Sequence, residues 1–373
     1  MPPILMIPGP VDVDEAVLGK MGLPLTPHYG PEWVKNYNET AGYLKKVLGT
    51  HGDAYLIPGS GTIAIEAAIG SLVGVGEKAI IGSNGFFGER LVQFTQAFGG
   101  ETIEVKAEWG KALSPNQFGE ALQQHPDAAL VEVVHFETST GILNPVREIA
   151  KVCKAAEVPI FMDGISSIGG VPFSMDDWGV DVTVTAPQKC LGAPPGLGLI
   201  GVASSVWPRI EQRAKQPHGW YSNLNTWRWY QINWADWHPS PMTMPVNIVL
   251  ALREALIQLF EEGLDQRITR LSSLANHLRS GLRDLQMPIA VPESMSSSVM
   301  TVAWGPRGVP TSQIVRFLEE EHGIHIGGGL GIFKDKVIRV GHMGPKTSIE
   351  IIDKLLGALK DFQRRHTHPS KVS

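Results

Sequence analysis

The feature that most constrains the fold is an alternation of short apolar runs with helical patterns along the first half of the chain. Seven runs rich in apolar and β-branched residues are predicted to be strands, at 54–58, 78–82, 101–105, 128–134, 158–163, 181–186 and 197–203. Helical periods separate several of them, at 62–73, 89–99, 116–125 and 145–157. This order predicts an α/β fold, with a mainly parallel seven-stranded sheet flanked by helices.

The last third of the chain has a different pattern, which predicts a smaller α+β domain. A long helical period at 244–285 is interrupted at Gly263, where we expect a break. Predicted strands and helices follow, with strands at 298–304 and 336–342 and helices at 311–323 and 349–365. We therefore expect a large domain at residues 15–250 and a small domain formed by residues 251–373 together with 1–14.

Composition and charge exclude several classes of function. The chain of 373 residues has a formal net charge of −5 and scattered basic residues, so no surface for nucleic acid is expected. The sequence has neither an apolar run that could span a bilayer nor the basic region of a secretory signal. Cys153 and Cys190 are too few for a disulfide framework. We expect a soluble, cytoplasmic protein that binds neither nucleic acid nor membrane.

Lys189 stands directly after the predicted strand 181–186, within APQKCLGAPPG (186–196). Most lysines lie on solvated surfaces, and a lysine at the end of a buried strand is unusual. Where water is scarce, an amine loses its proton more easily and becomes a nucleophile toward an aldehyde. The alternative is a lysine whose stem packs on the sheet while its amine reaches water.

Asp163 ends the predicted strand 158–163, and a turn of small residues follows it. Ligands of open α/β sheets bind beyond the carboxyl ends of the strands. A carboxylate placed there can cap a helix, bind a metal or pair with a cation on a ligand. No cluster of His, Cys and Asp with metal-ligand spacing surrounds Asp163, so no metal is expected. Taken alone, Asp163 is better explained as a helix cap.

Residues 58–68, PGSGTIAIEAA, predict a strand, a tight turn and a helix. The amides of Gly61 and Thr62 at the helix start, with nearby hydroxyls, would form an anion site. The segment lacks the GxxxxGK[ST] of a P-loop, and a simple tight turn explains it equally well in isolation. The match of GLGLIG (196–201) to the GxGxxG of dinucleotide folds lies inside a predicted strand, so we treat it as accidental.

Together the three segments predict one chemistry. Pyridoxal phosphate needs a lysine for a Schiff base, a carboxylate that keeps its pyridine nitrogen protonated, and an anion site for its phosphate. We therefore predict pyridoxal 5'-phosphate as the cofactor, with Lys189 and Asp163 as the catalytic residues.

The sequence resembles the class V aminotransferases of fold type I, most closely the alanine–glyoxylate and serine–glyoxylate group. The resemblance runs from IPGP (7–10) to the end of IRVGHMG (338–344), which is nearly the whole chain. Its motifs follow one another as SGTxxxEAA (60–68), SNGFFGER (83–90), HFETSTGILNP (135–145), DGISSIGG (163–170), APQKCLGAPPG (186–196) and GGGLG with IRVGHMG (327–344).

The resemblance implies roles around the cofactor ring and the substrate. Lys189 would form the Schiff base, and Asp163 would pair with the ring nitrogen. Phe87 would stack on the ring, and Arg339 would clamp the substrate carboxylate through a bidentate contact. Without the resemblance, Phe87 is better explained as a core aromatic and Arg339 as a surface residue.

The resemblance also implies a phosphate cradle and a dimer. Gly61, Thr62 and Gln188 would hold the phosphate, and Thr138 and Ser167 would lie near the ring hydroxyl or the phosphate edge. The family implies a homodimer in which a threonine of the partner completes the cradle. Thr243 aligns with that threonine, whereas Ser240 stands where many relatives have tyrosine, so no phosphate contact is assigned to Ser240. Residues 218–238 hold five of the ten tryptophans without a strong period, and we interpret them as interface packing or an aromatic wall.

The implied function is a pyridoxal-phosphate-dependent aminotransferase. It would move an amino group from a small L-amino acid, alanine or serine-like, to a 2-oxo acid such as glyoxylate or pyruvate, with Lys189 as the base that removes the Cα proton. An acidic donor would need a second cation, for which His28 and Arg228 are candidates. Two alternatives are a lyase or desulfurase on the same scaffold, for which Cys153 and Cys190 are poorly placed, and a non-catalytic binding protein.

Overall fold

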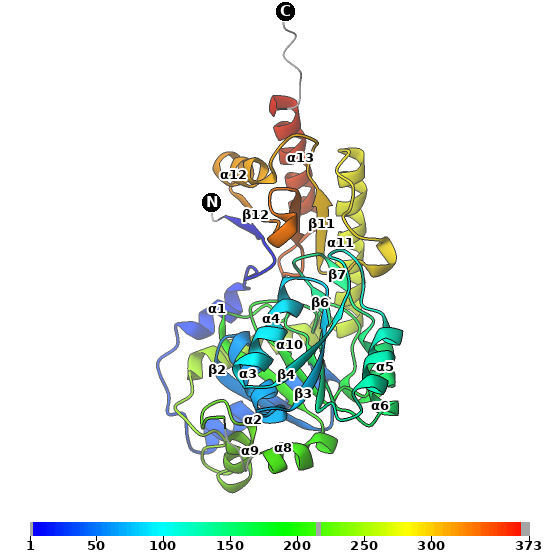
Figure 1. The fold of residues 1–373 in the computed structure, drawn as a ribbon. Helices are drawn as coiled ribbons and strands as arrows, with labels where there is room; N and C mark the ends of the chain where they lie inside the picture. The colour runs from blue at the N-terminus through cyan, green and yellow to red at the C-terminus, as the bar shows by residue number, and fades with distance from the viewer. Residues whose placement is uncertain (1–2, 214–217, 367–373) are drawn as a thin grey trace, which may run out of the picture.

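A seven-stranded sheet forms the centre of the computed structural model, which describes residues 3–213 and 218–366 (Figure 1). The strands lie in the order β2-β10-β9-β8-β5-β3-β4. Their bounds are β2 (Asp53–Gly59), β3 (Lys78–Ser83), β4 (Glu101–Lys106), β5 (Leu130–Val134), β8 (Ile160–Asp163), β9 (Val182–Thr185) and β10 (Gly196–Val202). All seven predicted strands are thus confirmed, and each is a strand of this sheet.

Six strands of the sheet run in one direction. The pairs β3–β4, β3–β5, β5–β8 and β8–β9 are parallel, and β10 is antiparallel to both β9 and β2. Every residue of β5, β8 and β9 is buried, as expected for strands that are covered on both faces. The glycines of GLGLIG lie within β10, which leads into a short turn of 3-10 helix at Ser204–Val206, so they form no dinucleotide loop.

The helices that pack on this sheet follow its strands along the chain. The predicted helical periods correspond to α3 (Gly61–Leu72), α4 (Phe86–Ala97), α5 (Pro115–Gln124) and α6 (Val146–Ala155). The sequence patterns did not predict a further set, namely α1 (Glu15–Met21), α2 (Pro31–Leu48), α7 (Met175–Trp178) and α8 (Trp207–Arg213). None of the helices in the described ranges is long and apolar enough to cross a membrane.

The tryptophan-rich segment contains a helix that was not predicted from its sequence. Residues 218–238 were expected to have no regular period, but α9 (Leu224–Asn233) lies within them and is capped by the Asn223 side chain. Only Leu224 and Trp227 of this helix are buried, while apolar side chains such as Trp229 and Ile232 are exposed. Aromatic residues around the whole helix therefore hide the amphipathic pattern on which the prediction relied.

A four-stranded sheet with the order β1-β12-β13-β11 lies in the upper part of Figure 1. Its strands are β1 (Ile4–Met6), β11 (Met300–Trp304), β12 (Ile324–Gly328) and β13 (Val337–Gly341), with β1 parallel to β12. The helices around it are α11 (Leu264–Asp284), α12 (Thr311–His322) and α13 (Ile349–His366). The predicted break at Gly263 is confirmed, because α10 (Val246–Glu262) ends there and the glycine has φ 86°.

Two clusters of buried apolar side chains follow the two sheets. The larger one surrounds the seven-stranded sheet and includes α10 as far as Leu259. The other surrounds the four-stranded sheet, begins at Leu271 in α11, and also takes in Met6 and Cys190. The division into domains at 15–250 and 251–373 stays a prediction.

Candidate active site

A cavity of about 150 Å³ lies beyond the carboxyl ends of the parallel strands. Seven of the ten predicted site residues line it, namely Gly61, Thr62, Phe87, Thr138, Asp163, Gln188 and Lys189. The rest of its wall is formed by Ser60, Ile65, Arg90, Phe94, Val134, Phe136, Ile165 and Ser166. A larger open groove lies at the opposite edge of the sheet, among Ala129, Pro159 and Asp181, but it contains no predicted site residue.

Lys189 lies in a tight turn after β9. The amide of Gly192 donates to the Lys189 carbonyl at 2.9 Å, and the Nζ atom of Lys189 donates to the carbonyl of Pro8. Burial lowers the pKa of the Lys189 amine, although the charge of Asp163 acts in the other direction. The amine is therefore deprotonated more easily than that of an exposed lysine, as a nucleophile or a base requires.

Gly9 passes directly over the Lys189 side chain. A Cβ atom at Gly9 would lie 2.5 Å from Lys189 Cδ and 2.6 Å from Nζ, and the glycine has φ +102°. Both the space and the backbone conformation therefore require glycine at this position. The N-terminal segment thus forms one wall around the amine.

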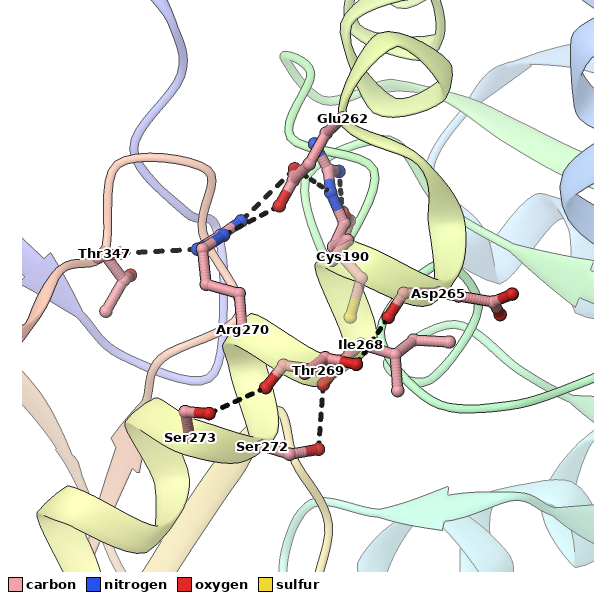
Figure 2. Close-up of polar contacts among 10 residues, drawn as sticks. Cys190, Glu262, Asp265, Ile268, Thr269, Arg270, Ser272, Ser273 and Thr347 are labelled. Carbon is pink, nitrogen blue, oxygen red and sulfur yellow. Dashed lines mark hydrogen bonds and ion pairs between the residues drawn. The ribbon is translucent and has the colours of Figure 1, made fainter.

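Figure 2 shows polar contacts around the start of α11, one of which reaches Cys190, the residue after Lys189 in the sequence. Glu262 forms ion pairs of 2.7 Å with both Arg267 and Arg270 at the junction of α10 and α11. The buried Arg267 donates through Nη1 to the carbonyl of Cys190 at 3.3 Å. The helix junction between the two sheets therefore fixes the backbone next to the amine.

Asp163 is the last residue of β8, and its carboxylate is nearly sealed from solvent. Its Oδ1 accepts a hydrogen bond from the Ile165 amide at 2.9 Å, whereas Oδ2 has no partner among the described residues. Burial raises the pKa of Asp163 to about 6, and the nearby charge of Glu137 adds to this rise. A ligand cation at Oδ2 would offset the cost of the buried charge. The carboxylate therefore suits a protonated pyridine nitrogen.

The start of α3 presents polar groups to the same cavity. The Ser60 hydroxyl caps the helix by accepting from the Thr62 amide at 3.3 Å. A Cβ atom at Gly61 would lie 2.7 Å from Ile165 Cδ1, so a larger residue would fill the space beside the helix start. The Gly61 amide has no acceptor among the described residues, and it favours an anion there together with the helix dipole. Gln188 lines the same cavity, with a buried side-chain oxygen that has no partner in the described part of the chain.

Glu137 fixes the first turn of α4, a role that was not predicted from the sequence. Its Oε2 accepts from the amides of Phe87 and Gly88, both at 3.0 Å. Its Oε1 accepts from the Ser139 hydroxyl at 2.6 Å. Because Glu137 also precedes Thr138, one buried carboxylate holds two walls of the cavity. The carboxylate within HFETSTG was the available signal.

Arg90 is a second residue that was not predicted from the sequence. It lies one turn beyond Phe87 on α4, and its guanidinium carbon is 5.7 to 6.0 Å from the ring centres of Phe94, Phe87 and Phe86. It has neither a hydrogen bond nor an ion pair with any described residue. The spacing of residues 87, 90 and 94 places all three side chains on one helix face, which is a pattern visible in the sequence.

Arg339 and Ser167 lie near the cavity without lining it. Arg339, on β13, donates through Nε to the Gly328 carbonyl at 2.6 Å and through Nη1 to the Thr138 carbonyl at 3.4 Å. Ser167 is fully buried, and its hydroxyl is 3.0 Å from His135 Nδ1. Their proposed contacts with substrate and cofactor stay predictions.

Thr243 does not line the cavity of its own chain, and it is exposed. Ser240 is fully buried, and its hydroxyl donates to the Met242 carbonyl at 3.5 Å. The two candidates for a second cation also lie outside the cavity. A hydrogen bond of 2.6 Å joins the His28 and His238 rings, and Arg228 forms an ion pair of 2.5 Å with Glu211.

Neither cysteine suits the chemistry of a desulfurase. Cys153 and Cys190 are both buried, and burial raises the pKa of each thiol to about 12. A reactive thiol needs an accessible site that stabilises the thiolate. The desulfurase alternative therefore loses its nucleophile.

Comparisons with known proteins agree with this geometry. The family model described as aminotransferase class-V matches residues 25–355. The chain is 36% identical to an uncharacterized aminotransferase of Methanocaldococcus jannaschii, over 91% of this chain and 88% of that protein. It is 30% identical to the serine–glyoxylate aminotransferase of Methylorubrum extorquens, over 95% of this chain and 89% of that protein. The solved structure of the alanine–glyoxylate aminotransferase from Nostoc sp. superposes with a TM-score of 0.93 at 31% identity, covering 97% and 95% of the two chains.

Proposed function

The chain belongs to the class-V aminotransferase family and is a transaminase of fold type I, and on that premise we propose that it moves an amino group from alanine or serine to glyoxylate or pyruvate. Relatives of the chain are named for alanine, serine and aspartate as donors to glyoxylate. The observation that carries the proposal is the single cavity that Lys189 and Asp163 share.

The family implies pyridoxal phosphate, and the residues around the cavity fit that group. We propose that Lys189 is its covalent anchor, that Asp163 Oδ2 pairs with its ring nitrogen, and that Phe87 covers the ring. Gly61, Thr62 and Gln188 would hold its phosphate at the start of α3. When bound, the cofactor supplies an aldehyde for the amino group and a ring that withdraws electrons from the substrate.

The protein's own residues would bind the substrate and move its proton. Arg339 would hold the substrate carboxylate through its guanidinium, which burial leaves in surroundings of low polarity. The Lys189 amine would take the proton from the substrate Cα and later return one. The lowered pKa of Lys189 supports this role, because a base must be unprotonated before it can act. The Pro8 carbonyl that accepts from Nζ would orient the amine.

Arg90 favours a second class of donor. An acidic amino acid carries a distal carboxylate, and Arg90 is a cation on the cavity wall that forms no ion pair with a described residue, although its charge also acts on Asp163. Phenylalanine rings surround its guanidinium, so a charge pair there would be weakly screened. Aspartate is therefore the alternative donor.

The proposed assembly is a homodimer with shared active sites, in the cytoplasm. Thr243 is exposed in the single chain, as a residue that reaches into a partner's cavity would be. Large apolar side chains are also exposed, with exposed fractions of 85% for Leu25, 63% for Ile232 and 50% for Trp237. Apolar side chains exposed to this degree are typical of a surface that contacts another protein.

A donor screen with the purified holoenzyme tests the proposal. Alanine, serine and aspartate are each paired with glyoxylate and with pyruvate, and both the keto-acid and the amino-acid products are measured. We expect turnover that requires a keto acid and is fastest with alanine or serine. Turnover of the donor without any keto acid would instead indicate a lyase. A protein that stays colourless with added cofactor would indicate a binding protein.

The variant Arg90→Met, run in the same screen, separates the donor classes. If aspartate is the donor, the variant loses activity with aspartate and keeps its activity with alanine. Equal losses with both donors would assign Arg90 no part in donor choice.

A further inference from the structure

A second arginine that is nearly sealed from solvent lies far along the chain from the cavity residues. Arg279, on α11, is 5% exposed, and its Nη2 atom donates to the carbonyl of Ser297. Its Nε atom is buried and has no hydrogen-bond partner among the described residues. No carboxylate in the described ranges forms an ion pair with Arg279. A buried guanidinium with an unpaired N–H donor is costly, and the charge of Glu293 offsets only part of that cost, so an anion bound beside Arg279 would be stabilised.

Arg279 forms part of the wall of a cavity of about 300 Å³ beside the four-stranded sheet. Arg283 lies one turn further along α11 and lines the same cavity, with Ser296 and the apolar Ile289. The one carboxylate on the wall is Glu293, which is engaged by Arg283 at 3.2 Å at the exposed rim. Two guanidinium groups and one rim carboxylate leave a net positive charge in a partly apolar hollow.

The wall of this cavity is connected to two elements of the active site. Ser296 forms an isolated antiparallel bridge with Ile142 in β7 (Ile142–Leu143), whose hairpin partner β6 (Phe136–Glu137) leads to Thr138. The Ser298 hydroxyl donates to the Gly170 carbonyl at 2.7 Å, at the end of the turn that follows Asp163. A ligand that orders residues 292–298 would therefore act on both segments.

We propose that this cavity binds a small oxyanion, either a carboxylate or a phosphate, between Arg279 and Arg283, and that the bound anion orders residues 292–298 against the active site. Guanidinium groups bind both kinds of oxyanion through paired N–H donors. The anion would displace Glu293 from Arg283 and satisfy the free donors of Arg279.

Calorimetric titration of the holoenzyme with inorganic phosphate, and separately with acetate, tests the proposal at constant ionic strength. The enzyme is first saturated with pyridoxal phosphate, so that its phosphate site is filled. We expect saturable binding of at least one anion. Tighter binding of phosphate would indicate a phosphate ligand, and tighter binding of acetate would indicate a carboxylate ligand. Arg283→Gln should weaken it by about tenfold, since one charge-assisted contact is lost. Arg279→Lys keeps the charge but removes the paired donors, and should weaken it similarly.

A second readout and a control keep the result specific. Amide exchange of residues 292–298 should slow when the anion is added to the wild type, and should not change in the two variants. Arg364→Gln, at an exposed arginine on α13 that pairs with Asp361, should bind the anion as the wild type does. Absence of saturable binding of both anions, or binding that is unchanged in both Arg279→Lys and Arg283→Gln, would overturn the proposal.

Discussion

Burial drives both Lys189 and Asp163 toward their neutral forms, and the two residues face one cavity. An amine that sheds its proton easily is useful as a nucleophile and a base. A carboxylate that is costly to keep charged is useful only when a cation arrives beside it. The pair is therefore prepared for a ligand that has an aldehyde at one end and a protonated nitrogen at the other.

The substitution Asp163→Asn should stabilise the protein without cofactor at high pH. The folded-state pKa is about 6 and the ordinary value is 3.8, so the folded carboxyl holds its proton more tightly than the unfolded one does. Stability is therefore lost as the pH rises from about 4 through 6, by up to ~3 kcal/mol. Urea unfolding should show the Asp163→Asn variant to be more stable than the wild type at pH 8 and close to it at pH 4.

The exposed Asp127 provides the matched control for that measurement. A hydrogen bond from Lys78 lowers the pKa of Asp127, whereas burial raises the pKa of Asp163. Asp127→Asn should therefore give no gain at pH 8. If Asp163→Asn also gave no gain there, the carboxyl would not carry the burial cost that we assign to it.

The substitution Lys189→Ala removes both the anchor and the base. We expect turnover to fall by at least about 100-fold, because a positioned general base contributes about that much or more. Added methylamine should restore part of the rate, since a small amine can enter the vacated space. Rates of each half-reaction, with and without the amine, provide the measurement. An alanine variant with wild-type turnover would exclude Lys189 from the chemistry.

Some site residues could be predicted from the sequence, and others only from the folded chain. Asp163 ends one apolar strand and Lys189 comes shortly after the next, so the strand pattern placed both at one edge of the sheet. Glu137 acts through amides of residues some fifty positions away, at Phe87 and Gly88. Arg90 matters because it contacts aromatic rings but forms no hydrogen bond or ion pair within the described residues. Contacts of that kind carry no local signal.

Among the elements, the buried strands were predicted best because each is a dense apolar run between turns. The strand β12 and the helix α2 were missed, although α2 is long and packs seven buried residues against its neighbours. The helix α9 was missed because its exposed aromatic residues obscure the period. Sequence patterns therefore predicted the strands of the central sheet and four of the helices that pack on it, whereas β12, α2 and α9 became evident only in the folded chain.

A substitution in the N-terminal segment tests whether an element outside the central sheet shapes the site. Gly9→Ala would force a Cβ to within 2.5 Å of the Lys189 side chain and would strain a backbone at φ +102°. We expect weaker cofactor retention and a visible spectrum that differs from the wild type. Gly19→Ala in α1 is the control, because nothing lies within 4 Å of its added Cβ. Identical cofactor retention in all three proteins would show that segment 7–10 does not confine the amine.

For the whole molecule, the proposed homodimer predicts complementation between two damaged chains. Lys189→Ala leaves Thr243 intact, and Thr243→Glu would place a negative charge where the partner's phosphate is held. A mixture refolded together should regain activity, because one site of each mixed dimer combines an intact Lys189 with an intact Thr243. Each variant refolded alone is the control and should stay weakly active or inactive. A mixture no more active than the sum of its parts would mean that the two residues serve the same chain's site.

Lys189, and no other lysine, is expected to bond covalently to pyridoxal phosphate. The direct test is peptide mass mapping of the holoenzyme after borohydride reduction, which makes the bond to the cofactor permanent. We expect one modified peptide, the one that contains Lys189, with full loss of its unmodified form. A cofactor mass on a different lysine, or on none, would contradict it.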